Sequence, residues 1–283
     1  MTVAEALRRG EERLRAAGVP DPALDAELLL RHALRWDRAA VIAHGEERLS
    51  EADEKRLFAL VEERAARRPL QHLTGTQAFW RHEFLVTPDV LIPRPETEVL
   101  VETALELIRG RPAPVVVDVG TGSGSIALSI AAERPDALVH AVDVSPAALA
   151  VARENARRLD LASRVCFHLG DLLEPWTALQ ASADLVASNP PYVDAADLAG
   201  LEPEVRVHEP TSALVPEGDP YSVYRRLFPQ SRRLLRPGGR VAVEVGRGMV
   251  DGVARLAGAA GLRLERIVPD LASIPRVVVA RRA

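Results

Sequence analysis

The sequence predicts an α/β protein with an open, mostly parallel sheet and a separate helical segment before it. From residue 115 onward, apolar runs typical of buried strands alternate with helical patterns. Four successive runs each end in glycines or in a polar side chain. Because ligands of open α/β sheets bind outside the carboxyl ends of the strands, this edge of the sheet is the expected ligand site.

The first strand, residues 115–119, leads into a glycine-rich turn and a helix over residues 126–132. The turn consists of Gly120, Thr121, Gly122, Ser123 and Gly124. Glycines let a ligand approach the backbone closely, and the following helix offers free N–H groups. A dinucleotide-binding turn would need another glycine at position 125, which is a serine here. The turn therefore favours a nucleoside without a pyrophosphate over NAD.

The next two strands end in acids. The strand over residues 137–142 precedes Asp143, which is placed to accept hydrogen bonds from ribose hydroxyls. Ser145 then caps a helix that Pro146 opens. The strand over residues 164–169 leads to Asp171 and Leu172. Both acids are therefore candidates for ligand binding.

The fourth strand, residues 183–188, runs into Asn189, Pro190, Pro191 and Tyr192. Asn-Pro is a common turn opener, so this tetrapeptide alone leaves a structural role open. The chain has only two asparagines, and the other is Asn155. One polar group at the end of each of four strands favours a binding or catalytic site.

These motifs together are similar to class I S-adenosylmethionine-dependent methyltransferases that act on a planar nitrogen. Three further stretches, residues 79–80 (Phe-Trp), 91–98 (Leu-Ile-Pro-Arg-Pro-Glu-Thr-Glu) and 189–193, resemble the HemK/PrmC family of peptide chain release factor glutamine (N5) methyltransferases. The resemblance covers nearly the whole chain, including residues 206–210. It implies a Rossmann-like seven-stranded sheet whose last strand is antiparallel, S-adenosylmethionine as cofactor, S-adenosylhomocysteine as product, and release factors as protein substrates.

The family resemblance also implies the site residues. The expected cofactor-binding residues are Gly120, Thr121, Gly122, Ser123, Gly124, Asp143, Asp171, Leu172 and Asn189. The expected substrate-binding residues are Asn189, Pro190, Pro191, Tyr192 and Arg94, and the expected catalytic residues are Asn189, Pro190 and Tyr192. Leu172 departs from the Trp or Phe often found there, which would replace adenine stacking by aliphatic contact. Arg94 is either a solvated turn residue or a cation near the methionine carboxylate or the substrate path.

The expected chemistry follows from the weak nucleophilicity of an amide nitrogen. The side-chain oxygen of Asn189 and the backbone carbonyl of Pro190 can each accept one N–H of the substrate amide. Proline fixes φ and donates no hydrogen bond, so the loop presents acceptors in a rigid form. Such acceptors would aim the nitrogen and favour the positive charge that develops on it, while Tyr192 packs against the amide.

Three parts are expected along the chain: a helical, substrate-binding domain (1–75), a hairpin linker (76–93) and the methyltransferase domain (94–283). Helices are predicted over residues 3–17, 22–34 and 51–68. Their segment holds 13 basic and 14 acidic residues, which is not the basic surface of a nucleic-acid binder. Partner docking and a cap over the sheet both fit this segment; the resemblance favours docking.

Composition narrows the alternatives further. The net charge of −4, the lack of a long apolar run and the lack of a signal-peptide pattern predict a cytoplasmic enzyme without direct nucleic-acid or membrane binding. The single cysteine, Cys166, sits in an apolar strand and is expected to be buried. No metal-ligand spacing stands out. The competing interpretations are an adenine or guanine amino methyltransferase on DNA or RNA and a methyltransferase-like protein without catalytic activity.

Overall fold

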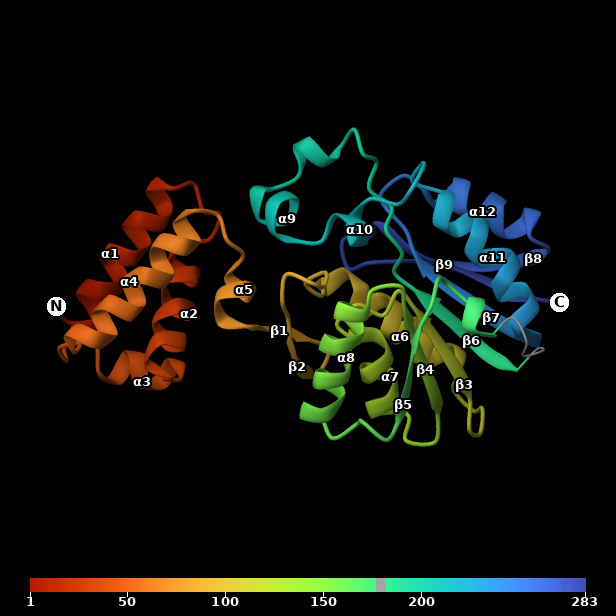
Figure 1. The fold of residues 1–283 in the computed structure, drawn as a ribbon, viewed down its shortest axis with the longest axis horizontal. Helices are drawn as coiled ribbons and strands as arrows, with labels where there is room; N and C mark the ends of the chain where they lie inside the picture. Colours follow the sequence, from red (N-terminus) through yellow and green to blue (C-terminus); the bar gives the residue numbers. More distant parts are fainter. Residues whose placement is uncertain (177–181) are drawn as a thin grey trace. The chain divides into compact units, whose positions relative to one another are not determined.

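The structure is a computed structural model that describes residues 1–176 and 182–283. It comprises two compact units (Figure 1). One contains residues 1–76 and 201–208, and the other contains residues 77–200 and 209–283. The smaller unit is therefore built from two separate pieces of the chain.

The larger unit contains a seven-stranded sheet with the order β5-β4-β3-β6-β7-β9-β8. Its strands are β3 (Val115–Val119), β4 (Leu138–Asp143), β5 (Val165–Leu169), β6 (Ala183–Ser188), β7 (Leu235–Glu244), β8 (Leu262–Pro269) and β9 (Pro275–Arg282). Strands β3 to β7 pair in parallel, and β9 runs antiparallel to both β7 and β8. The predicted sheet and its antiparallel last strand are confirmed.

Helices cover both faces of this sheet because alternate strand residues are apolar on each face. Val116 packs in a core with α6 (Glu98–Leu107) and α7 (Ser125–Glu133), whereas its neighbour Val117 packs in the opposite core with α11 (Ser222–Leu234) and α12 (Val250–Ala259) (Figure 1). Helix α8 (Pro146–Arg158) begins at Pro146 as predicted, and the Ser145 hydroxyl accepts from the Ala148 N–H. The central strands of the sheet are therefore buried on both sides, as their continuous apolar sequences predict.

Short elements complete the larger unit. They are η1 (Pro95–Thr97), η2 (Glu174–Trp176), η3 (Leu198–Gly200), α10 (Thr211–Leu214) and a two-stranded sheet of β1 (Thr76–Phe79) and β2 (His82–Leu85). This hairpin lies within the predicted hairpin linker (76–93). Phe79 and Phe84 pack edge to face with ring centroids 6.0 Å apart. Pro95 opens the 3₁₀ turn η1, which continues directly into α6.

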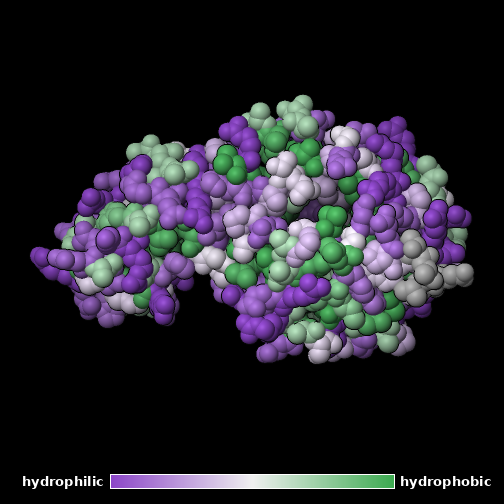
Figure 2. Space-filling model, in the orientation of Figure 1, coloured by the Kyte–Doolittle hydropathy of each residue, from purple (hydrophilic) through white to green (hydrophobic). Residues whose placement is uncertain are grey.

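The smaller unit contains α1 (Val3–Ala16), α2 (Pro22–Leu34), α3 (Arg38–Ala43), α4 (Glu51–Ala65), α5 (Leu70–Thr74) and α9 (Pro203–His208). Thr2 and Glu5 form a capping box on α1, and Ser50 caps α4. Helix α4 ends three residues before the predicted position 68, and α3 and α5 are too short for a periodic pattern to reveal. The face drawn in Figure 2 is mainly hydrophilic over these helices.

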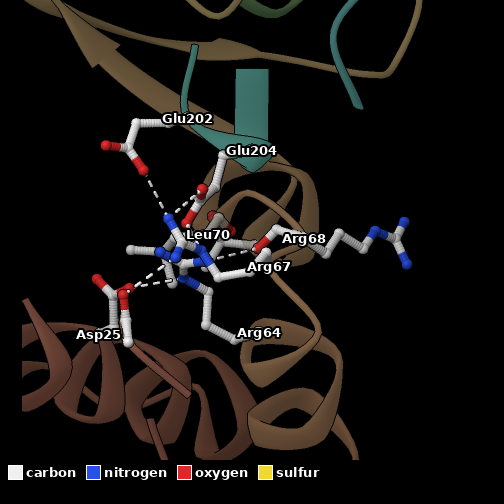
Figure 3. Close-up of polar contacts among 9 residues, drawn as sticks. Asp25, Arg64, Arg67, Arg68, Leu70, Glu202 and Glu204 are labelled. Carbon is white, nitrogen blue, oxygen red and sulfur yellow. Dashed lines mark hydrogen bonds and ion pairs between the residues drawn. The ribbon is translucent and has the colours of Figure 1, made fainter. Parts of the chain in front are cut away.

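A network of charged side chains, two of them buried, joins the two pieces of the smaller unit (Figure 3). The Arg64 guanidinium donates to Asp25 of α2 at 2.7 Å and to Glu204 of α9 at 2.8 Å. Arg67 donates to Glu204 at 2.7 Å and to Glu202 at 2.8 Å. Arg64 is only 5% exposed, so its own contacts take place largely away from water, whereas Glu202 is exposed. The ion pairs therefore hold residues 201–208 on the helical unit.

One sequence expectation fails in the larger unit. Cys166 was expected to be buried, but it is exposed. Strand β5 lies at the edge of the sheet and is only partly covered, so its apolar sequence does not bury every side chain. Within the part of the chain that the structure describes, no helix is long and apolar enough to cross a membrane.

Candidate active site

The glycine-rich turn lies between the end of β3 and the start of α7. Gly122 has a φ of +54°, and a Cβ at this position would point into open space. Gly124 has a φ of +84°, and its Cβ would meet Leu128 at 3.0 Å and Ala152 at 3.2 Å. Both values of φ disfavour L side chains. Gly124 is required for tight packing, whereas Gly122 leaves room beside the turn for a ligand.

Asp118, inside β3, stabilises the glycine-rich turn through its side-chain hydrogen bonds. Its Oδ2 accepts from the Thr121 hydroxyl at 2.7 Å and from the Ala127 N–H at 3.2 Å. Burial raises the pKa of Asp118 to about 7, although both hydrogen bonds oppose the rise. Asp118 was not among the predicted site residues. An acid in the middle of a β-branched run was the available signal, because a buried carboxyl needs hydrogen-bond partners.

Asp143, at the end of β4, faces the turn from the neighbouring strand. Its Oδ2 accepts from the Gly122 N–H and its Oδ1 from the Ser145 N–H, both at 2.9 Å. Burial raises the pKa of Asp143, and these backbone hydrogen bonds oppose the rise. Each carboxylate oxygen can accept more than one hydrogen bond. Asp143 therefore shapes the glycine turn and still has acceptor capacity for ribose hydroxyls.

A cavity of about 200 Å³ opens over the carboxyl ends of β3, β4 and β6. It brings together most of the predicted cofactor-binding residues: Gly120, Gly122, Asp143, Asp171, Leu172 and Asn189. Thr121, Ser123 and Gly124 support the turn and do not line the cavity. The apolar walls of the cavity include Val119, Val142 and Val144. A concave site with an acid and apolar walls fits a nucleoside with hydroxyl groups.

The third strand contributes a more exposed wall. Asp171 pairs with Arg226 of α11, and its side chain is 40% exposed. Leu172 has a φ of +53°, a conformation that is unusual for a leucine. Backbone strain of this kind persists where the surrounding structure fixes it, commonly at ligand sites. Arg226 also lines the cavity and was missed by the sequence analysis, since α11 lies more than fifty residues further along the chain.

The Asn-Pro-Pro-Tyr loop leaves β6 between this cavity and a smaller one of about 70 Å³. Both cavities share Leu91, Asn189, Pro190, Pro191 and Ala213. The Asn189 Nδ2 donates to the Thr97 hydroxyl at 3.1 Å, and its Oδ1 accepts no hydrogen bond from residues 1–176 or 182–283, so it can accept one from a ligand. The loop thus forms the common wall of two adjoining spaces and has an amide oxygen available there.

Tyr192 closes the other end of the loop. Its hydroxyl donates to Glu244 Oε1 at 3.3 Å, and burial raises the pKa of Tyr192 well above its usual range. A Cβ on Gly246 would lie 3.0 Å from the Tyr192 ring, so the absence of a side chain at position 246 makes room for it. The ring also lines the smaller cavity. Tyr192 is therefore held at both its ring and its hydroxyl.

Arg94 is paired with a buried acid. Its guanidinium contacts Glu209, whose side chain is 1% exposed, and the other oxygen of Glu209 accepts from the Ile92 N–H at 3.1 Å. Arg94 lines the smaller cavity together with Asn189 and Tyr192. This places the arginine beside the loop and fixes the Pro-Arg-Pro corner to Glu209.

Besides Asp118 and Arg226, the described site contains three further polar residues that were not predicted: Thr97, Glu209 and Glu244. Thr97 and Glu209 lie inside stretches that carry the family resemblance, but only the structure shows what they touch. Glu244 ends an apolar strand, as Asp143 does, and the same rule could have identified it.

The sheet order, the glycine turn beside Asp143 and the Asn-Pro-Pro-Tyr loop at the same edge define a class I methyltransferase. A family model described as "PrmC N-terminal domain" matches residues 5–75, and one described as "Methyltransferase domain" matches residues 111–257. A solved structure titled as a methyltransferase from Pyrococcus furiosus has 17% identity and a TM-score of 0.52, covering 80% of this chain and 98% of that chain; it supports the fold alone.

Two relatives match over nearly their full lengths. A "Release factor glutamine methyltransferase" from Moorella thermoacetica is 46% identical, covering 100% of this chain and 99% of the relative. One of the same name from Cereibacter sphaeroides is 44% identical, covering 99% of each chain. The chain belongs to the release factor glutamine methyltransferase family.

Replacing Asp143 with alanine is expected to weaken binding of S-adenosylhomocysteine by about ten- to hundredfold. The change removes a charged acceptor whose hydrogen bonds contribute about 1.5–3 kcal/mol, and it frees the Gly122 N–H. Isothermal titration calorimetry measures the affinity. Asp171→Ala is the matched comparison, because this acid lines the same cavity but is more exposed and should matter less. Equal losses in the two variants would contradict the role given to Asp143.

Proposed function

We propose that this protein transfers a methyl group from S-adenosylmethionine to the side-chain amide nitrogen of the glutamine in the Gly-Gly-Gln loop of peptide chain release factors. Family membership supports this function, since relatives at 44–46% identity over the full chain carry that name. The structural observation that carries it is the position of Asn189. Its free amide oxygen lies at the wall shared by a nucleoside-sized cavity and a smaller one.

The larger cavity is the proposed cofactor site. The turn from Gly120 to Gly124, with Asp143, Asp171 and Leu172, would hold the cofactor, which supplies an electrophilic methyl group on a sulfonium. Asp143 would accept from the ribose hydroxyls. Leu172, in place of an aromatic residue, would give the adenine an aliphatic contact. The room above Gly122 supports this assignment.

The smaller cavity is the proposed site of the substrate amide. Asn189 Oδ1 would accept one N–H of the glutamine amide, and the Pro190 carbonyl would accept the other. These acceptors aim the nitrogen lone pair and stabilise the positive charge that develops on it. Tyr192, held by Glu244, would pack on the amide, and Pro191 and Arg94 would line the entry. The cationic amide is strongly acidic, so no side chain needs to remove a proton beforehand.

Residues 1–75 are the proposed docking region for the release factor, with 76–93 as linker and 94–283 as the methyltransferase domain. The match of residues 5–75 to the "PrmC N-terminal domain" supports a role specific to this family. Residues 1–75 contain thirteen basic and fourteen acidic residues, a balance that does not favour binding of nucleic acid by this region. A cytoplasmic location belongs to the same proposal, since release factors act in translation there.

The direct test incubates the protein with S-adenosylmethionine and a purified release factor and locates the added methyl group by mass spectrometry. We expect one methyl group on the glutamine of the Gly-Gly-Gln loop. A release factor with that glutamine replaced by alanine is the matched control and should stay unmodified. Transfer to DNA or RNA in parallel reactions, with none to the release factor, would replace this proposal by a nucleic-acid amino methyltransferase.

A further inference from the structure

Asn155 is a buried amide on α8, next to the glycine-rich turn. It is one of only two asparagines in the chain, and the other is Asn189 of the Asn-Pro-Pro-Tyr loop. Asn155 is 0% exposed and lines neither of the two cavities. Burial of an amide is costly unless its hydrogen bonds are made, so its partners indicate what the side chain does.

The Asn155 amide connects two segments of backbone. Its Oδ1 accepts from the Leu85 N–H at 2.7 Å, and its Nδ2 donates to the Leu85 carbonyl at 3.0 Å and to the Ser123 carbonyl at 2.9 Å. An asparagine amide has two N–H donors, and both are used here. A reversed amide would set its NH₂ group against the Leu85 N–H. Asn155 therefore links the end of β2 to the glycine-rich turn in one defined orientation.

The contact with Ser123 lies at the part of the turn that faces the larger cavity. Two consecutive residues of the turn are held by side chains from different elements. Asp143 of β4 accepts from the Gly122 N–H at 2.9 Å, and Asn155 of α8 donates to the Ser123 carbonyl at the same distance. The space that Gly122 leaves for a ligand is therefore bounded by backbone that Asn155 helps to fix.

The contact with Leu85 lies at the start of a segment, residues 85–91, that leads to both cavities. Val86 and Val90 of this segment are buried in a small apolar cluster with side chains of α8. Val90 and Leu91 line the larger cavity, and Leu91 also lines the smaller one. The segment is thus a wall of both spaces, and its first residue is bonded to Asn155 through both its N–H and its carbonyl.

We propose that Asn155 is a positioning residue that holds residues 85–91 against the glycine-rich turn and thereby keeps the substrate cavity aligned with the cofactor cavity. This inference rests on the proposed function, which assigns the two cavities. All the residues involved belong to the larger unit. Methyl transfer requires the nitrogen and the methyl group to meet at short distance and in line, and a displacement of about 1 Å can cost about a hundredfold in rate.

The first test compares Asn155→Ala with Leu159→Ala at a temperature well below the melting temperatures of both variants. Without the amide, the turn and the segment lose their link. We therefore expect kcat in single-turnover methylation of a release factor to fall about tenfold or more. Calorimetry should show about three- to tenfold weaker binding of S-adenosylhomocysteine, because one hydrogen bond to the turn is lost.

Leu159 is the matched control because it lies at the end of the same helix and packs against the core that contains Leu128 and Val139. Leu159→Ala should lower the melting temperature and leave kcat and affinity unchanged. A residue with a purely structural role would behave in this way as well. Wild-type kcat in Asn155→Ala, or equal falls in kcat for both variants, would overturn the proposal.

The second test uses the wild-type protein and does not depend on a core variant that folds. Selective ¹⁵N-asparagine labelling yields two side-chain NH₂ pairs, and Asn189→Ala assigns them. Added S-adenosylhomocysteine should shift the Asn189 pair, since Asn189 lines the larger cavity. It should also shift the Asn155 pair, through the Ser123 carbonyl, and slow amide hydrogen exchange over residues 85–91. A response of Asn189 alone, with no change at Asn155 or in residues 85–91, would overturn the link.

The two tests separate this inference from the proposed function. If the wild-type protein binds S-adenosylhomocysteine but does not methylate a release factor, the proposed function fails, while the Asn155 signals and the exchange of residues 85–91 still test the link. If it methylates the release factor and these signals do not respond to the ligand, the inference fails and the proposed function stands.

Discussion

Replacing Asn189 with alanine is expected to lower kcat by about 10²–10³ while leaving cofactor affinity nearly unchanged. The lost oxygen is an acceptor whose contribution grows as charge develops on the amide nitrogen, so the loss falls on the transition state. The glycine turn and Asp143 carry most of the cofactor contacts and do not depend on this side chain. Single-turnover methyl transfer at saturating cofactor gives kcat, and calorimetry with S-adenosylhomocysteine gives the affinity.

Asn189→Asp distinguishes acceptor chemistry from loop geometry. Aspartate keeps an acceptor oxygen and adds a charge that favours a cationic transition state, so partial activity is expected, limited by the cost of burying a second carboxylate near Glu244. It also loses the NH₂ group that donates to Thr97. Full activity in the alanine variant would mean that Asn189 is a turn residue and that other groups orient the nitrogen.

Features encoded by neighbouring residues could be predicted from the sequence. The glycine turn, the Ser145 cap and the acid after β4 each depend on a few consecutive residues, and the structure has them where the sequence placed them. The common edge at which these groups meet follows the same logic, because parallel strands joined by helices bring their carboxyl ends together. The family resemblance supplied the antiparallel last strand.

Features encoded by distant pairs could not be predicted. Thr97 and Asn189 are 92 positions apart, and Arg94 and Glu209 are 115 apart. The sequence around either residue does not indicate which distant residue it contacts. For the same reason the attachment of residues 201–208 to the helical unit could not be predicted, because it depends on ion pairs between residues 135 to 140 positions apart. The predicted burial of Cys166 was wrong for a related reason: whether a strand lies at the edge depends on the order of the whole sheet.

Replacing Arg64 with alanine is expected to destabilise the smaller unit by about 3–5 kcal/mol, because it leaves the buried carboxylate of Asp25 without this cation; Glu204 is partly buried and keeps its pair with Arg67. Burial raises the pKa of Asp25, and Arg64 opposes the rise. Burial also acts to raise the pKa of Glu204, but Arg67 and Arg64 outweigh it and lower the pKa overall. The stabilisation from Glu204 is therefore present above its unfolded pKa and is lost as pH falls through the lowered value, so the deficit of Arg64→Ala should shrink in acid.

Trp36 lies in the smaller unit, whereas Trp80 and Trp176 lie in the larger one. When Trp80 and Trp176 are replaced by phenylalanine, the fluorescence of Trp36 reports unfolding of the smaller unit alone. Arg13→Ala is the matched control: its pair with Glu62 is in the same unit and has side chains 44% and 57% exposed, so its loss should destabilise the unit far less than the loss of Arg64. Equal losses of stability in the two variants would contradict the importance of the buried network.

If residues 1–75 dock the release factor, Arg64→Ala should raise KM for that substrate at temperatures where the unit is partly unfolded. Affinity for S-adenosylhomocysteine should stay the same, because every residue assigned to the cofactor belongs to the larger unit.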